Sequence, residues 1–162
     1  MIFHDATARS GPSKPPVSPP TISEPVPILV DTGVLLGAID ADDAAHTRCA
    51  ALLDVHAPGL PVPVTVIADA AWQLENNVGV EAEAALLDSV ITGELTVVDI
   101  TAADYVRAVE LIRRYADLGL GLVDASAIAI AERLNVTTIA TLDRRDFTDV
   151  RPAHRDTFEL VP

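Results

Sequence analysis

Four aspartates are the residues of this 162-residue chain whose type and placement could support chemistry: Asp31, Asp69, Asp124 and Asp143. Carboxylates that meet in one place repel one another, and burial raises the pKa of some of them, so a cluster is costly unless a cation compensates. Carboxylate oxygens select a hard ion, Mg²⁺ or Mn²⁺, over zinc. Such an ion bridges to phosphate oxygens and lowers the pKa of a water that it binds, which predicts a metal-dependent phosphate site.

Each acid has a simpler interpretation when it is taken alone. Asp69 and Asp124 could favour the positive end of a helix, and Asp124 could be an N-cap. Asp31 and Asp143 could each close a strand with a side-chain turn. The metal hypothesis therefore depends on whether the fold brings the four acids together.

The elements that must position these acids alternate between short apolar strands and longer helices. Strands are predicted at 28–30, 61–65, 95–98 and 137–141, with a possible late edge strand at 158–161. Helices are predicted around 35–39 and at 46–56, 66–76, 80–90, 104–115 and 124–134. Thr65 is a possible cap of the third of these helices, and Thr101 with Asp104 has the pattern of a capping box.

Steady alternation of strand and helix predicts an α/β fold with parallel strands and helices on both faces. Sites in such sheets lie beyond the carboxyl ends of the strands. Asp31 and Asp143 directly follow strands, Asp69 lies early in the helix after the second strand, and Asp124 begins a helix. We therefore expect all four to meet at one edge of one sheet.

The charge balance limits how the protein could handle nucleic acid. There are 11 Lys and Arg against 24 Asp and Glu, for a formal net charge of -13 at pH 7. This excludes a broad basic surface that neutralises phosphates. Lys14 is the only lysine, so phosphatases and receiver domains that need a lysine after a late strand are also excluded. A bound metal would supply the missing positive charge locally.

Other features point to a soluble protein of the cytoplasm. Cys49 is the only cysteine, so neither an intrachain disulfide nor a cysteine-rich zinc site can form. No apolar stretch approaches the ~18 residues of a membrane span. Residues 1–10 lack the apolar core of a signal peptide.

Residues 1–27 differ in composition from the rest, because they hold seven of the 12 prolines beside Ser, Thr and Gly. Such a segment buries too little apolar surface to order its backbone. We expect a disordered tail, which could be a docking arm or an unstructured leader, followed by one domain at 28–162.

Three motifs in register resemble those of PIN-domain ribonucleases, specifically toxins of the VapC type: 30–36 (VDTGVLL), 119–126 (GLGLVDAS) and 140–147 (ATLDRRDF). The resemblance covers 28 to roughly 161. It implies a three-layer α/β/α sandwich with a mostly parallel central sheet, and a Mg²⁺-dependent endoribonuclease that hydrolyses RNA phosphodiesters. It also implies a homodimer that a cognate antitoxin inhibits.

The resemblance assigns roles to single residues. Asp31 and Asp124 match the principal metal-binding acids, and Asp143 matches the acid of the Thr-x-Asp motif, so these three are the expected metal ligands. Asp69 stands where the family usually has Glu and completes the expected catalytic set. The side chain of Asp69 is shorter than that of Glu, which puts in question whether it contacts the metal or positions a water. Asp146 is a substitute or outer acid, and Asp117 is a structural or outer group.

Several neighbouring residues have two open interpretations each. Arg144 and Arg145 could grip RNA phosphates or form a solvated pair at a helix end. Thr32, Thr141 and Ser126 could orient ligands through their hydroxyls or act as ordinary caps. Trp72 could meet a partner or lie in the core.

One alternative function of a different class stays open. The shorter acid at Asp69 is compatible with a catalytically silent PIN-like module that binds RNA or a protein without cleavage. Metal-dependent cleavage of RNA would distinguish the enzyme from the silent module.

Overall fold

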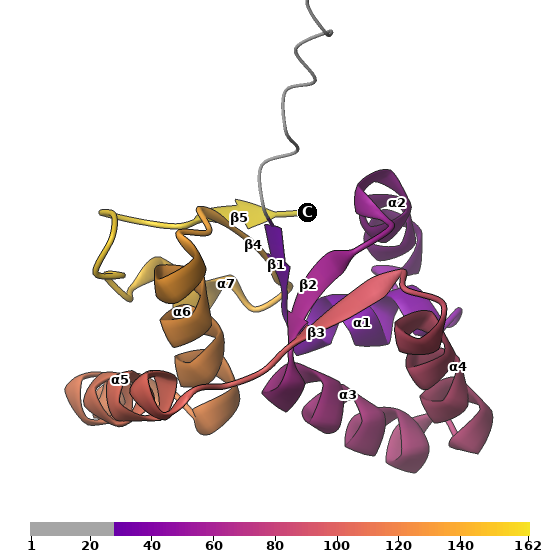
Figure 1. Ribbon diagram of the computed structural model, residues 1–162. Coiled ribbons are helices and arrows are strands. Elements are labelled where there is room, and N and C mark those ends of the chain that lie inside the picture. The colour runs from indigo at the N-terminus through magenta and orange to yellow at the C-terminus, as the bar shows by residue number, and fades with distance from the viewer. Residues whose placement is uncertain (1–27) are drawn as a thin grey trace, which may run out of the picture.

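A computed structural model describes residues 28–162, and the predictions made for residues 1–27 lie outside the described residues. The described chain is an α/β fold (Figure 1). In chain order its elements are β1 (Ile28–Val30), α1 (Thr32–Ile39), α2 (His46–His56), β2 (Leu60–Pro63), α3 (Val64–Asn77), α4 (Val80–Ile91), β3 (Leu95–Val98), α5 (Ala102–Arg114), the 3₁₀ helix η1 (Ala116–Leu118), α6 (Leu122–Leu134), β4 (Thr138–Ala140), α7 (Arg144–Thr148) and β5 (Glu159–Val161).

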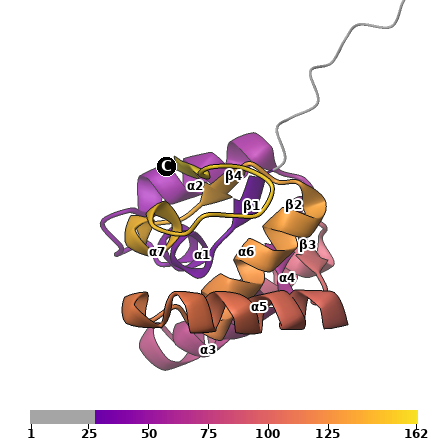
Figure 2. The same cartoon turned by 90° about the vertical axis from the view of Figure 1, so that its left-hand side faces the viewer.

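Two hydrophobic cores lie on opposite faces of the strands, because successive strand side chains point to opposite faces. Ile28 and Val30 of β1 pack with α1, α2, α3 and α4, whereas Leu29 packs with α5 and α6. All three residues are buried, so β1 has no polar face. Figures 1 and 2 show the two helical layers on either side of the strands. The predicted three-layer α/β/α arrangement is confirmed.

All strand pairs are parallel, but the ladder is interrupted. One sheet has the order β1-β4-β5, and β2 pairs with β3 in a second sheet. β2 lies beside β1 without joining its ladder. The backbone N–H of Leu60 donates toward β3, to the carbonyl of Glu94 at 3.1 Å. The backbone N–H groups of successive residues in a strand point to opposite neighbours, so the backbone nitrogens of Pro61 and Pro63 point toward β1. Proline has no N–H, so neither residue can donate a hydrogen bond to β1. The expectation of one continuous sheet is wrong for this reason.

Helix boundaries confirm one predicted cap and correct two others. Thr101 and Asp104 form the capping box at the start of α5. Thr65 is not a cap, because α3 already begins at Val64. Asp124 is the third residue of α6, whose N-cap is Gly121, so the helix begins two residues earlier than predicted.

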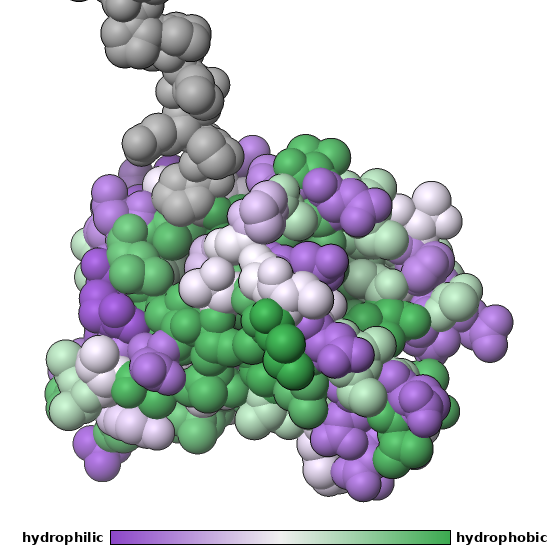
Figure 3. Space-filling model, turned by 45° about the vertical axis from the view of Figure 1, so that its right-hand side comes forward, coloured by the Kyte–Doolittle hydropathy of each residue, from purple (hydrophilic) through white to green (hydrophobic). Residues whose placement is uncertain are grey.

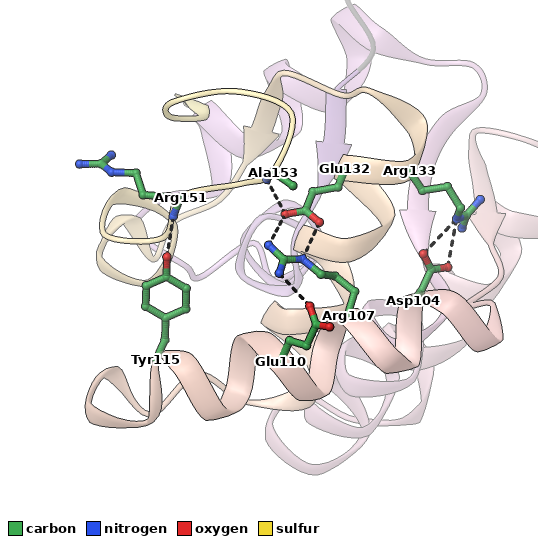
Figure 4. Close-up of polar contacts among 8 residues, drawn as sticks. All are labelled: Asp104, Arg107, Glu110, Tyr115, Glu132, Arg133, Arg151 and Ala153. Atoms are coloured by element: carbon green, nitrogen blue, oxygen red, sulfur yellow. Dashed lines mark hydrogen bonds and ion pairs between the residues drawn. The ribbon is translucent and has the colours of Figure 1, made fainter.

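Ion pairs join α5 to α6, and hydrogen bonds join α6 and Tyr115 to the segment before β5 (Figure 4). Arg107 donates to both carboxylate oxygens of Glu132, at 2.8 and 2.9 Å, and Glu132 also accepts from the backbone N–H of Ala153. Arg133 donates to Asp104. Burial alone would raise the pKa of Asp104, but hydrogen bonds from Thr101 and Arg133 hold it below its ordinary value. These contacts join the C-terminal end of α6, which is the end far from Asp124, to α5 and to the segment before β5.

The surface of the described residues carries several large apolar side chains. Trp72 is 64% exposed, so the interpretation that places it in the core is wrong. Figure 3 shows apolar residues gathered in one broad area of the face that it displays. None of the helices within residues 28–162 is both long enough and apolar enough to cross a membrane.

Candidate active site

A cavity of about 620 Å³ opens beyond the carboxyl ends of β1 and β4, where the sequence predicted a site. All four predicted catalytic aspartates line it, and Asp146 is a fifth. The full lining consists of Asp31, Thr32, Gly33, Leu36, Asp69, Gln73, Gly121, Leu122, Val123, Asp124, Leu142, Asp143 and Asp146.

Asp31 lies at the base of the site, in the first position after β1. Its backbone N–H donates to the carbonyl of Ala140 on β4 at 2.9 Å, which fixes it at the sheet edge. The Thr141 hydroxyl donates to Oδ2 of Asp31 at 2.8 Å, and both residues are buried. Burial raises the pKa of Asp31, and the nearby charges of Asp143 and Asp69 raise it further, against the opposing hydrogen bonds from Thr141 and Thr32.

Asp124 projects into the cavity from the first turn of α6. Burial raises its pKa to about 6, and the charges of Asp31 and Asp146 add to that shift. Hydrogen bonds with the backbone of Gly121 and of Asp124 itself oppose the shift without cancelling it. Asp31 and Asp124 therefore destabilise each other as anions, which is the electrostatic signature of a site suited to a cation.

Asp69 enters from α3, in the second turn of that helix. Gln73, one turn later on the same face, donates from Nε2 to Oδ2 of Asp69 at 2.9 Å. Both side chains are half-buried and line the cavity. Sequence reasoning missed Gln73, although its spacing of four residues from a candidate acid was a usable signal.

Asp143 and Asp146 close the side of the cavity formed by α7. Asp143 is exposed and caps α7, accepting from the backbone N–H of Arg145 at 3.2 Å. Asp146 is half-buried and pairs with the guanidinium of Arg145 at 3.3 Å. Asp143 thus bonds to the backbone two residues later, as the side-chain turn predicted, and this contact also caps α7.

The structure does not bring every predicted residue to the cavity. Asp117 is exposed on η1, and neither Arg144 nor Arg145 lines the cavity. The Arg144 guanidinium donates to the carbonyl of Pro162, and that of Arg145 donates to the carbonyl of Leu118.

The three hydroxyls that could orient ligands or act as ordinary caps lie in different environments. Thr141 contacts Asp31 directly. Ser126 instead shares a hydrogen bond with Thr65 of α3 at 2.6 Å and donates to the carbonyl of Val123, so it joins two helices. Thr32 lines the cavity, and its buried Oγ1 has no hydrogen-bond partner within residues 28–162.

The donor chemistry of the cavity suits a hard divalent cation. Its polar lining is dominated by carboxylates, and the Thr32 hydroxyl adds a buried oxygen that has no partner in the described part of the chain. Among the residues described, no group of three or more His, Cys, Asp or Glu is placed to hold a metal ion by itself. Mg²⁺ normally keeps several waters and takes only one or two carboxylates with the substrate phosphates, so it fits such a lining without a complete protein cage. The ligand set Asp31, Asp124 and Asp143 stays a prediction.

Comparison with known proteins identifies the fold family. Residues 28–151 match the PIN domain. The chain belongs to the PIN-domain family. The match extends from β1 through α7, so it includes every element that lines the cavity of this PIN domain.

The proteins that this PIN domain resembles include two VapC proteins and a toxin-antitoxin complex. Ribonuclease VapC26 of Mycobacterium tuberculosis is 32% identical over 135 residues, which is 83% of this chain and 100% of the relative. The crystal structure of VapC20 of Mycobacterium tuberculosis, a Sarcin-Ricin loop cleaving toxin, superposes with a TM-score of 0.64 at 21% identity, covering 69% of this chain and 86% of that one. A toxin-antitoxin complex from Klebsiella pneumoniae gives 0.59 at 16% identity, covering 83% and 96%.

Proposed function

We propose that this PIN domain is a Mg²⁺-dependent endoribonuclease, with Mn²⁺ as a possible substitute, and the toxin of a toxin–antitoxin pair. The observation that carries the proposal is the convergence of five aspartates on one cavity at the carboxyl ends of β1 and β4. The relationship to a protein named Ribonuclease VapC26 supports the same activity. The charge of Asp31 adds to the raised pKa of Asp124, and a bound cation would relieve that repulsion.

The residues of the site have distinct proposed tasks. A bound divalent ion would supply charge neutralisation and polarise the phosphate for attack. Asp31, Asp124 and Asp143 would hold that ion. Asp69 or Asp143 would orient the attacking water and accept its proton. Thr141 keeps Asp31 in one orientation through the hydrogen bond at 2.8 Å, and the Thr32 hydroxyl, unpartnered among residues 28–162, lies in the next position of the chain.

Two arginines, an outer acid and the domain boundary complete the proposal. Arg144 and Arg145 are exposed beside the cavity and would contact flanking phosphates, while Asp146 would act as an outer acid.

The PIN unit is proposed to span 28–162, because β5 pairs with β4 beyond the end of the family match at 151.

The proposed protein partners are a cognate antitoxin and a second copy of the chain. Toxin-antitoxin complexes among the structural neighbours support the antitoxin. Exposed apolar side chains on three helices support protein contacts in general: Trp72 on α3, Ile91 on α4 and Val106 on α5. The broad apolar area in Figure 3 is consistent with such contacts.

Cleavage of a structured RNA by the purified protein in Mg²⁺ and in EDTA tests the activity. We expect cleavage only with metal, and we expect Asp31→Asn and Asp124→Asn to abolish it while preserving the circular dichroism spectrum. Asp88→Asn, an exposed acid of α4 that does not line the cavity, is the matched control and should cleave normally. If the protein binds RNA but does not cleave it in the presence of metal, the proposed enzyme activity is wrong and a silent binding module is favoured.

A further inference from the structure

Asp69 and Gln73 form a pair within the wall of the cavity. They lie four residues apart on α3, and the amide Nε2 of Gln73 donates to Oδ2 of Asp69 at 2.9 Å. Residues at this spacing face the same side of a helix. The pair occupies one side of the cavity, and the charge of Asp69 is close enough to raise the pKa of Asp31.

A similar arrangement occurs at Asp31. Oδ2 of Asp31 accepts from the neutral hydroxyl of Thr141, just as Oδ2 of Asp69 accepts from the neutral amide of Gln73. Within residues 28–162, neither Oδ1 atom takes part in a side-chain hydrogen bond. In each carboxylate the side-chain donor contacts Oδ2, and Oδ1 has no side-chain partner among these residues.

The neutrality of both donors has a chemical consequence. An amide or hydroxyl orients a carboxylate without cancelling its charge, so the full negative charge stays available to a cation. A lysine or arginine at the same distance would neutralise the acid and repel a divalent ion. Asp146 shows the contrast, because its carboxylate is paired with the guanidinium of Arg145 at 3.3 Å.

We propose that Gln73 is a positioning residue that holds one oxygen of Asp69 so that the other can accept a hydrogen bond from a water on the bound ion. Asp69 would thereby add to the affinity for the ion without being one of its direct ligands. The proposal rests on the proposed function and deepens it, because it adds a specific outer contact to the site. Hydrogen-bond partners of this kind typically change metal affinity or activity by about 10–100-fold when they are removed. The same contact adds little to helix stability.

The experiment compares Gln73→Met, which keeps side-chain length but removes the donor, with the wild-type chain. Mn²⁺ affinity is measured directly by electron paramagnetic resonance of free Mn²⁺, and kcat and KM for RNA are measured separately. Thermal unfolding of the metal-free protein reports on any structural effect. Asn76→Met is the matched control, because Asn76 is an exposed amide on α3 that does not line the cavity.

We expect Gln73→Met to weaken Mn²⁺ binding about tenfold and to lower kcat at limiting metal, with KM and the unfolding temperature unchanged. Asn76→Met should leave all four quantities unchanged. In the Asp69→Asn background, Gln73→Met should cause no further loss of Mn²⁺ affinity, because the acid through which it acts is gone.

Two results would overturn the role of Gln73: wild-type Mn²⁺ affinity in Gln73→Met, or an equal loss of affinity in both backgrounds. If the wild-type chain binds Mn²⁺ and cleaves RNA while Gln73→Met behaves identically, only the positioning role fails. If the wild-type chain neither binds Mn²⁺ nor cleaves RNA, the proposed function fails together with it.

Discussion

The hydroxyl of Thr141 donates to the carboxylate of Asp31 at 2.8 Å, although the two residues are separated by 110 positions in the chain. Both are buried, and each directly follows a strand of the same parallel pair, β1 and β4. The same Oγ1 accepts from the backbone N–H of Asp143 at 3.0 Å. Thr141 thus connects the most buried acid of the cavity to the loop that carries another.

Replacement of Thr141 by valine should destabilise the protein, because the buried carboxylate of Asp31 loses its side-chain donor. Leaving a buried acceptor unsatisfied costs about 1–3 kcal/mol. The pKa of Asp31 should also rise further, since the Thr141 hydrogen bond lowers it. Urea denaturation in EDTA measures the first effect, and NMR titration measures the second. Thr92→Val, which removes an exposed hydroxyl, should change neither quantity.

The free energy of unfolding of the metal-free protein should fall as pH rises from 4 to 6, because of Asp124. Its pKa rises from an ordinary 3.8 to about 6 on folding, so the native state binds more protons than the unfolded state in this range. Stability then decreases as pH rises: the penalty is absent below about 3.8 and complete above about 6. A shift of two units corresponds to up to about 3 kcal/mol.

Urea denaturation of the wild-type chain and of Asp124→Asn across this range measures the difference. The variant should lose less stability as pH rises and should be the more stable protein at pH 7 in EDTA. Added Mg²⁺ should stabilise the wild-type chain at pH 7 by mass action and should have less effect on the variant. A pH profile identical in both proteins would show that Asp124 ionises in the fold as it does in water.

Glu132→Gln should reduce stability and leave catalysis intact. Glu132 accepts two hydrogen bonds from Arg107 and one from the backbone of Ala153, and none of these residues lines the cavity (Figure 4). The variant loses the charge that the half-buried guanidinium of Arg107 pairs with, so we expect a loss of about 1–3 kcal/mol. Urea denaturation and RNA cleavage at 25 °C check the two parts. A large fall in kcat without unfolding would contradict this separation.

Arg144→Gln and Arg145→Gln should each weaken RNA binding if their guanidinium groups contact phosphates. Each variant should raise KM and reduce the slope of log affinity against log salt by about 0.7–0.9, the value for one phosphate contact. kcat should change little. Fluorescence anisotropy with labelled RNA at several salt concentrations measures the slope. An unchanged slope would leave Arg144 with its structural contact to Pro162, and Arg145 with its contacts to Leu118 and Asp146.

Much of the fold was predictable because its signals are local. Three consecutive apolar residues before Asp31 indicated a strand at 28–30, and the structure confirms it. The capping box of Thr101 and Asp104 also depends only on residues three apart, and it forms as expected. Thr65 and Asp124 were placed wrongly relative to helix starts, because apolar residues before each helix are equally compatible with strand and loop.

The candidate site was predictable in part. The carboxyl-end rule for parallel sheets placed the four aspartates at one edge, and all four line one cavity. Asp117 was not excluded by any pattern, although it lies exposed outside the cavity. The exposure of Trp72 was not predictable either, because average burial describes the residue type and not the direction in which a helix presents it.

The sequence by itself determined the α/β class, the order of the elements and the strand ends that carry Asp31 and Asp143, because these follow from periodicity and neighbouring residues. Only the tertiary structure decided that Thr141 contacts Asp31, that Gln73 holds Asp69, and that the sheet is interrupted between β1 and β2. Hydrogen bonds and pKa shifts depend on directions and distances of a few ångströms between groups. Those are set by packing across the whole domain, which no local pattern encodes.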